Sequence, residues 1–121
     1  MVVDMKDVYW LAGLVEGEGC FYLHKRTKMP CIILGMTDRD VIERAAQIFG
    51  AQVYCMPVKR PAPRKTIWRI NFAGTLAAEW MMTLYSLMGT RRKEQIHKAL
   101  TAWKSVPAVA KRNRRRFHGA S

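Results

Sequence analysis

A nine-residue stretch near the N-terminus, from Leu11 to Gly19, constrains the fold of this chain more than any other feature. It reads L-A-G-L-V-E-G-E-G, so Gly13 and Gly17 lie four residues apart in an otherwise helical run. A glycine inside a helix costs about 1 kcal/mol relative to alanine. Such glycines are favoured where another backbone comes very close. The stretch therefore predicts a helix that packs tightly against a second helix.

The side chains of this helix divide into two stripes. Those that face the chain's own core are Val8, Leu11, Leu14 and Val15, at helical spacing. Trp10, Gly13 and Gly17 lie on the adjacent stripe, which we assign to a partner helix. Burial of both stripes inside one chain is the alternative. The sequence contains no second copy of the stretch, so we expect the facing helix to come from a second subunit.

The nine residues resemble the signature of the LAGLIDADG homing endonucleases, with L-A-G-L-V-E-G-E-G in this chain. The resemblance implies a homodimer with one signature per subunit, which cuts double-stranded DNA at a long pseudo-palindromic site. In proteins of this kind the last acidic residue of the signature, here Glu18, binds the metal. The two Glu18 side chains of such a dimer would converge near the two-fold axis. Two phosphates, one in each strand, would then be cut across the minor groove, which leaves a short 3′ overhang.

A carboxylate suits the chemistry that this resemblance implies. Mg²⁺ (or Mn²⁺) held by Glu18 would supply a Lewis acid, an activated water and a template for the phosphate. A carboxylate at a helix C-terminus is also poorly placed against the helix dipole, so it favours a nearby cation. For Glu16 we expect a structural role, in which its side chain binds backbone.

The hydrophobic pattern predicts an α+β fold with the order αββαββα, followed by a C-terminal helix and a basic tail. The predicted helices span residues 7–18, 38–49, 75–88 and 91–103, and the strands 20–26, 31–36, 52–58 and 66–73. Thr37 or Asp38 is expected to cap the second helix and Gly50 to end it. Residues 1–105 form one domain in this prediction, and 106–121 form the tail. By the resemblance, the sheet is a curved antiparallel saddle for DNA.

The net charge of +12 points to a polyanionic partner. Ten basic residues and one acidic residue lie in 91–121, whereas 1–90 hold eleven basic and eight acidic residues. No basic stretch has the broad apolar face of a membrane-surface helix. Three widely spaced cysteines and the lack of a signal peptide or membrane span predict a reduced, intracellular protein that does not bind membranes.

The remaining candidate site residues follow from the resemblance and from strand alternation. A basic residue that stabilises the transition state is expected at the start of the last helix, as Arg92 or else Lys93. Base reading in the major groove is expected from polar side chains on one sheet face: Tyr22, His24, Arg26, Tyr54, Arg69 and Asn71. Phosphate contacts are expected from Lys59, Arg60, Arg64 and Lys65 and from the tail arginines.

Two other functions stay open from the sequence. Homing endonucleases often have a glutamine-type residue at the end of strand two, where this chain has Leu34, Gly35 and Met36. This departure favours a dimer that binds DNA with little or no cutting, or a maturase that binds RNA during splicing. A plain basic nucleic-acid-binding or ribosome-associated protein is the third possibility.

Overall fold

The computed structural model describes residues 3–56 and 66–104 of the chain. Its elements are α1 (Met5–Glu18), β1 (Gly19–Leu23), β2 (Pro30–Met36), α2 (Arg39–Phe49), β3 (Val53–Met56), β4 (Ile67–Ala73), α3 (Thr75–Leu84), the 3₁₀ helix η1 (Tyr85–Leu87) and α4 (Thr90–Lys104). The predicted αββαββα order with a further C-terminal helix is confirmed. Lys59, Arg60, Arg64, Lys65 and the tail lie outside the described residues.

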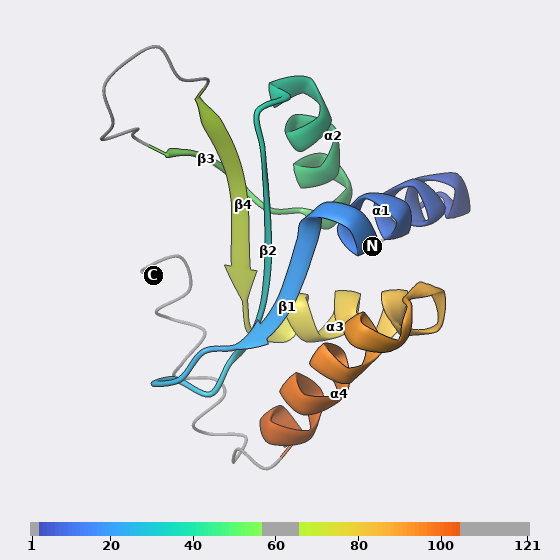
Figure 1. Ribbon diagram of the computed structural model, residues 1–121, viewed down its shortest axis with the longest axis vertical. Coiled ribbons are helices and arrows are strands. Elements are labelled where there is room, and N and C mark those ends of the chain that lie inside the picture. Colours follow the sequence, from blue (N-terminus) through green and yellow to red (C-terminus); the bar gives the residue numbers. More distant parts are fainter. Residues whose placement is uncertain (1–2, 57–65, 105–121) are drawn as a thin grey trace.

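The four strands form one antiparallel sheet in the order β1-β2-β4-β3. The helices cover one face of this sheet, as Figure 1 shows with the sheet seen nearly edge-on. The register pairs Tyr22 with Cys31 and Tyr54 with Arg69. Because side chains alternate between faces along a strand, these residues share the face turned away from the helices. We call it the open face.

Aromatic side chains join α2, β4 and α3 in the core. The ring centroid of Phe49 lies 4.9 Å from that of Phe72 and 5.2 Å from that of Trp80. The buried Trp80 indole Nε1 donates a hydrogen bond to the Phe49 carbonyl at 3.0 Å. Each such ring pair contributes about 0.5–1.5 kcal/mol beyond the area it buries. These contacts fix α2 and α3 against the sheet, in the same helical layer that contains α1.

The ends of α2 agree with the sequence prediction in one respect and differ in another. Gly50 ends the helix in the left-handed conformation (φ 76°), and its N–H donates to the Ala46 carbonyl at 2.9 Å. Asp38 precedes the first turn, but its side chain makes no capping hydrogen bond. Because this helix start is exposed, water can satisfy the N–H groups that a cap would bind.

The first strand is shorter than predicted, which moves two candidate DNA-binding residues. It ends at Leu23, so His24 and Arg26 lie in the β1–β2 turn and not on the strand. The His24 N–H donates to the Met29 carbonyl at 2.9 Å, and its ring Nδ1 accepts from the Thr27 N–H at 3.3 Å. A tight connection to β2 uses these residues, so period-two alternation extended the strand too far.

Gly19 is expected to be required for stability. A Cβ at this position would lie 3.0 Å from both Val15 Cγ1 and the Val15 carbonyl oxygen, in the last turn of α1. Gly19→Ala should therefore destabilise the chain by about 1–3 kcal/mol, the usual cost of overpacking. Urea unfolding of dilute, monomeric protein measures this loss. Gly17→Ala is the matched control, since a Cβ at Gly17 meets none of the described atoms within 4 Å. An equal loss in both variants would contradict the steric explanation.

Candidate active site and nucleic-acid interface

Glu18 is the last residue of α1 and its side chain is exposed. Within residues 3–56 and 66–104, no hydrogen bond or ion pair engages its carboxylate. A carboxylate at a helix C-terminus faces the negative end of the helix dipole, which makes a bound cation favourable there. Glu18 is thus an available anionic ligand at the point where α1 passes into β1.

Glu16 binds backbone, as predicted. Its carboxylate Oε1 accepts a hydrogen bond at 2.6 Å from the N–H of Gly89, the residue directly before α4. This places a negative charge at the positive end of the α4 dipole. A Cβ on Gly89 would lie 2.5 Å from the same oxygen, so a glycine is needed for the carboxylate to come this close.

Arg92 returns the contact from α4 to α1. Its guanidinium Nε and Nη2 both lie 3.4 Å from the Glu16 carbonyl oxygen, and Nε lies 3.7 Å from Glu16 Oε2. The last four carbonyls of a helix have no partner within the helix, and this is one of them. The end of α1 and the start of α4 therefore cap each other through Glu16, Gly89 and Arg92. We call this arrangement the reciprocal cap.

Gln95 connects the reciprocal cap to the sheet. Its side-chain Oε1 accepts from Arg92 Nη1 and from the N–H of Phe21, both at 3.2 Å. Phe21 lies on β1, an edge strand of the sheet, and Gln95 binds one of the backbone N–H groups that such an edge leaves without a strand partner. Glu18 and Gly19 are therefore held between two fixed points, Glu16 before them and Phe21 after them.

Arg92 is expected to contribute strongly to stability. Its side chain is only 8% exposed, and a methionine would remove both guanidinium donors to the Glu16 carbonyl and one of the two donors to Gln95 Oε1. We expect Arg92→Met to cost about 2–3 kcal/mol. Arg92→Lys should cost about 1–2 kcal/mol, since one ammonium cannot reproduce the fork of the guanidinium. Urea unfolding measures both, with Arg91→Lys on the neighbouring exposed residue as the control. Full rescue by lysine would show that charge alone matters.

The two basic residues predicted near the carboxylates occupy different surroundings. Arg92 lies in the reciprocal cap, whereas the Lys93 ammonium lies 5.6 Å from the centroid of the Tyr85 ring on η1. The structure thus brings Arg92 to the Glu16 end of α1 and packs Lys93 against η1. Sequence reasoning did not identify Gln95 or Gly89 as members of this site.

A divalent metal fits Glu18 on chemical grounds. Carboxylate oxygens are ligands that Mg²⁺ and Mn²⁺ accept, and Mg²⁺ is usually held by one or two carboxylates together with phosphate oxygens and waters. In the part of the chain that the structure describes, no three His, Cys, Asp or Glu side chains lie together as a ready-made metal site. A metal at Glu18 would therefore take its other oxygens from water, from a bound phosphate or from a second subunit.

The open face carries four of the predicted DNA-binding residues, Tyr22, Tyr54, Arg69 and Asn71. The Tyr22 hydroxyl donates to Asn71 Oδ1 at 3.4 Å. Burial raises the pKa of the Tyr22 phenol, and the neighbouring Cys31 thiol raises it further, so the hydroxyl keeps its proton at neutral pH. The Asn71 amide is thereby oriented, and its NH₂ group has no acceptor among the described residues.

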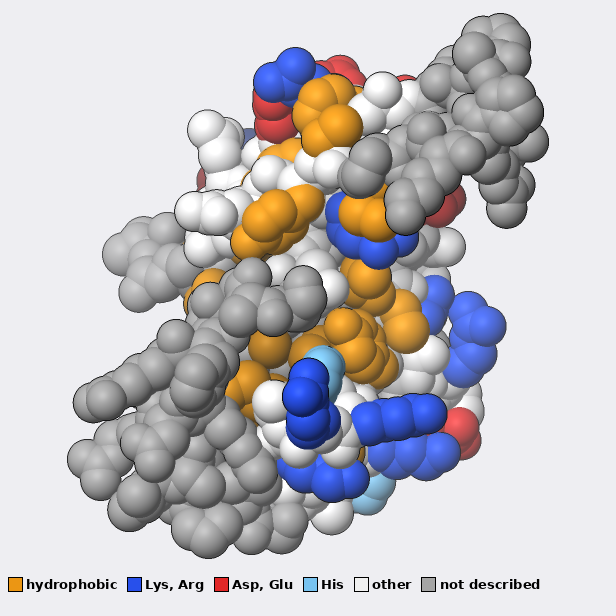
Figure 2. Space-filling model, turned by 90° about the vertical axis from the view of Figure 1, so that its left-hand side faces the viewer, with side chains coloured by type: hydrophobic (Ala, Val, Ile, Leu, Met, Phe, Trp, Pro, Cys, Tyr) orange, Lys and Arg blue, Asp and Glu red, His pale blue; other side chains and the backbone are white. Residues whose placement is uncertain are grey.

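Arg69 has an open hydrogen-bonding position at the centre of the sheet. Its Nε is buried and, among the described residues, has no hydrogen-bond partner. Gly35 is its cross-strand neighbour, and a Cβ there would lie 3.9 Å from that nitrogen. Figure 2 looks onto the open face, where hydrophobic side chains run along the middle and Lys and Arg gather at the lower end. That end carries the β1–β2 turn with the exposed Lys25 and Arg26.

The glycine stripe of α1 faces open space. Gly13 and Gly17 are exposed, and a Cβ on either would meet nothing within 4 Å. Tyr9 and Met5 continue the four-residue spacing towards the N-terminus and are 58% and 56% exposed. Sequence reasoning missed both residues, although extending the glycine spacing by two turns finds them. The described chain leaves this helix face uncovered.

Trp10 is partly used inside the chain. It packs against the core, and the Arg44 guanidinium of α2 lies 4.0 Å from the centroid of its ring. Arg44 also approaches Asp7, with Nη2 3.6 Å from Oδ1. Because Trp10 is half-buried and Tyr9 is exposed, Tyr9 offers more free surface on α1 than Trp10 does.

Comparison with known proteins supports the fold. No protein-family model matches the chain, and the search of curated proteins gives no match. Among solved structures, it is similar to the homing endonuclease I-CvuI, crystallised in complex with the I-CreI target in the presence of Mg with the DNA not cleaved. The TM-score is 0.61 at 16% identity, over 88% of this chain and 73% of that one. The chain thus has the α+β fold of a homing endonuclease.

Proposed function

We propose that this chain is a metal-dependent, site-specific DNA endonuclease that acts as a homodimer on a long pseudo-palindromic site. The observation that carries the proposal is Glu18, whose carboxylate has no partner among the described residues and which ends a helix whose glycine face these residues leave uncovered. The shared fold with I-CvuI supports the same conclusion. The basic balance of the sequence agrees with a polyanionic substrate.

Pairing of two α1 helices through the Gly13 and Gly17 face brings two Glu18 carboxylates to the two-fold axis. Each carboxylate would hold a divalent metal (Mg²⁺ or Mn²⁺) for one of the two DNA strands. The metal, when bound, supplies Lewis acidity and an activated water. Arg92, through the reciprocal cap, holds the helix end that carries Glu18, and Lys93 is the further basic residue available on α4. Trp10 flanks the subunit contact.

The open face binds the major groove in this proposal. Arg69 offers the guanidinium fork that suits guanine, and Asn71 offers the amide that suits adenine. Tyr22 orients Asn71, and Tyr54 lies beside Arg69 across the sheet. His24 and Arg26 reach DNA from the β1–β2 turn. Lys59, Arg60, Arg64, Lys65 and the tail bind phosphates, which adds affinity without sequence information.

Selection from a random DNA library tests the proposal. The purified chain is incubated with randomised duplexes and Mg²⁺ or Mn²⁺, and the ends of cut products are sequenced. We expect a single pseudo-palindromic consensus with short 3′ overhangs, and no products in EDTA. Products without a consensus, or cutting that persists in EDTA, would contradict the proposal.

A DNA-binding protein without cutting activity, or an RNA maturase, is the second candidate. It is favoured by the end of β2, where Leu34, Gly35 and Met36 offer no side chain that could position water. The same library separates the two functions if bound duplexes are also recovered and sequenced. A consensus among bound duplexes with no cut product in either metal would favour this second function, and selective binding of intron RNA would favour the maturase.

A further inference from the structure

A groove runs along the outer side of α4, between this helix and the α3–η1 segment. Two adjoining hollows of about 290 and 340 Å³ form it, and both are lined by Tyr85 and His97. Its residues belong neither to the open face nor to the glycine face of α1. Apart from Lys93, which the proposed endonuclease function also uses, the lining of this groove is left without a role.

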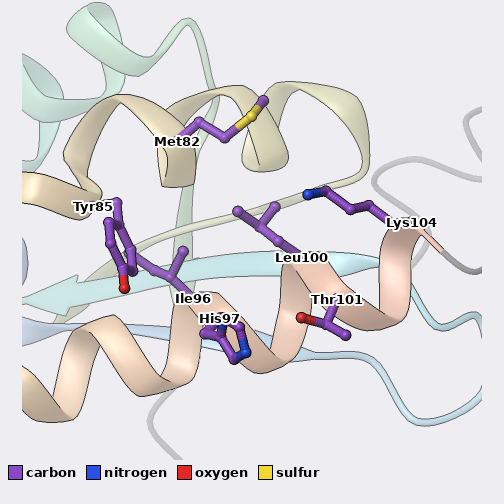
Figure 3. A pocket seen from close by; sticks show the side chains of 7 residues that line it. All are labelled: Met82, Tyr85, Ile96, His97, Leu100, Thr101 and Lys104. Atoms are coloured by element: carbon purple, nitrogen blue, oxygen red, sulfur yellow. The ribbon is translucent and has the colours of Figure 1, made fainter.

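The floor of the groove is apolar. Figure 3 shows Leu100 of α4 pointing towards Met82 of α3, with Ile96 and Tyr85 beside them. The side chains of Met82 and Tyr85 are 59% and 41% exposed. Covering large apolar side chains releases about 25 cal/mol for each Å² removed from water, so this floor favours an apolar occupant.

The rim of the groove is basic. Three lysines line the two hollows, Lys93, Lys98 and Lys104. Glu94 is the one acidic residue of the described lining, so positive charge predominates there. In Figure 3 the Lys104 side chain turns back over the gap towards Leu100, which places a positive charge above the apolar floor. An occupant that carries negative charges beside apolar side chains satisfies both parts of this surface.

We propose that the groove binds an acidic peptide segment with large apolar side chains, supplied by a protein partner. The apolar floor disfavours a nucleic acid, whose phosphates would meet the lysines but leave Met82 and Leu100 uncovered. The chain's own residues 105–121 are basic and would place like charges on the rim. An amphipathic acidic segment, with apolar anchors on one side, matches the known helix-in-groove type of recognition.

Peptide selection tests this proposal with the full chain. A random peptide library displayed on phage is selected against the protein, and an enriched peptide is synthesised with a fluorescent label. We expect enriched peptides with a net negative charge and several large apolar residues. In fluorescence anisotropy, Met82→Asp and Lys104→Glu should each weaken binding by about tenfold or more.

Matched controls separate the groove from general attraction to a basic protein. Thr83→Asp adds the same charge beside Met82, and Lys25→Glu reverses a charge in the β1–β2 turn; both residues are exposed and neither lines the groove. We expect both controls to bind the peptide like the parent chain, and added duplex DNA not to displace it. Circular dichroism confirms that all four variants are folded.

Several outcomes would overturn the proposal. These are no enriched peptides, enriched peptides without acidic and apolar residues, equal weakening by the controls, or displacement of the peptide by DNA or RNA. If removal of residues 105–121 increased the affinity for the peptide, these residues would instead be identified as the occupant of the groove. None of these results bears on Glu18, because peptide binding is measured without metal and without cleavage.

Discussion

Glu18→Gln is expected to abolish DNA cleavage while leaving DNA binding intact. The amide has nearly the shape of the carboxylate but lacks the charge that holds a divalent cation. Loss of the metal's Lewis acidity, worth several kcal/mol, corresponds to a fall of about a thousandfold or more in the cleavage rate. Single-turnover cleavage of the selected target measures the rate, and anisotropy with the same labelled duplex measures binding.

Binding by Glu18→Gln is expected to be independent of metal, whereas binding by the parent chain should strengthen when Mg²⁺ is added. Glu79→Gln removes an exposed carboxylate on α3, far from α1 in sequence, and serves as the control. Its cleavage rate should match that of the parent chain. Undiminished cutting by Glu18→Gln would show that another group holds the metal.

Gly13→Leu is expected to break the homodimer. A leucine there projects into the uncovered side of α1, where a second helix is proposed to pack. Overpacking costs about 1–3 kcal/mol per site, and a two-fold interface contains the site twice. The dimer should therefore weaken by roughly 2–6 kcal/mol, or about 30-fold to 10⁴-fold. Sedimentation equilibrium measures the association constant, and cleavage should fall in parallel.

Gly13→Ala is expected to weaken the dimer without destabilising the folded monomer. In Gly13→Ala the added Cβ meets no atom of the described residues within 4 Å, and alanine favours a helix over glycine by about 1 kcal/mol. Monomeric Gly13→Ala should thus be as stable as the parent monomer or slightly more stable, yet dimerise less well. Gln47→Leu, on the exposed side of α2, is the control for added apolar surface. A parent chain that is monomeric at all accessible concentrations would contradict the dimer.

Local sequence signals predicted the order of helices and strands well, because each signal reflects a physical preference of the residues in that segment. Gly50 had to end α2, since the left-handed conformation there suits glycine. The alternation in β4 separated Arg69 and Asn71 from Ile70 and Phe72 correctly. These patterns depend on residues close in the chain, so no tertiary information was needed.

Contacts between distant residues could not be predicted in the same way. The Glu16–Gly89 hydrogen bond joins residues 73 apart, and Gln95 reaches Phe21 across 74. The expected backbone role of Glu16 was right, but the partner could not be named. The β1–β2 turn shows another limit: the alternation of Tyr22, His24 and Arg26 continued past the point where the hairpin needs to turn.

The reciprocal cap has a consequence for protein engineering. Glu16 of α1 binds the start of α4, Arg92 of α4 binds the end of α1, and Gly89 leaves room for the Glu16 carboxylate. Exchanging one of these three residues alone therefore leaves a group without its partner. Grafting α4 from a related protein would carry Arg92 away from the Glu16 carbonyl and place a new residue against its carboxylate. Chimeras of this fold should therefore exchange the end of α1, Gly89 and the first turn of α4 as one cassette.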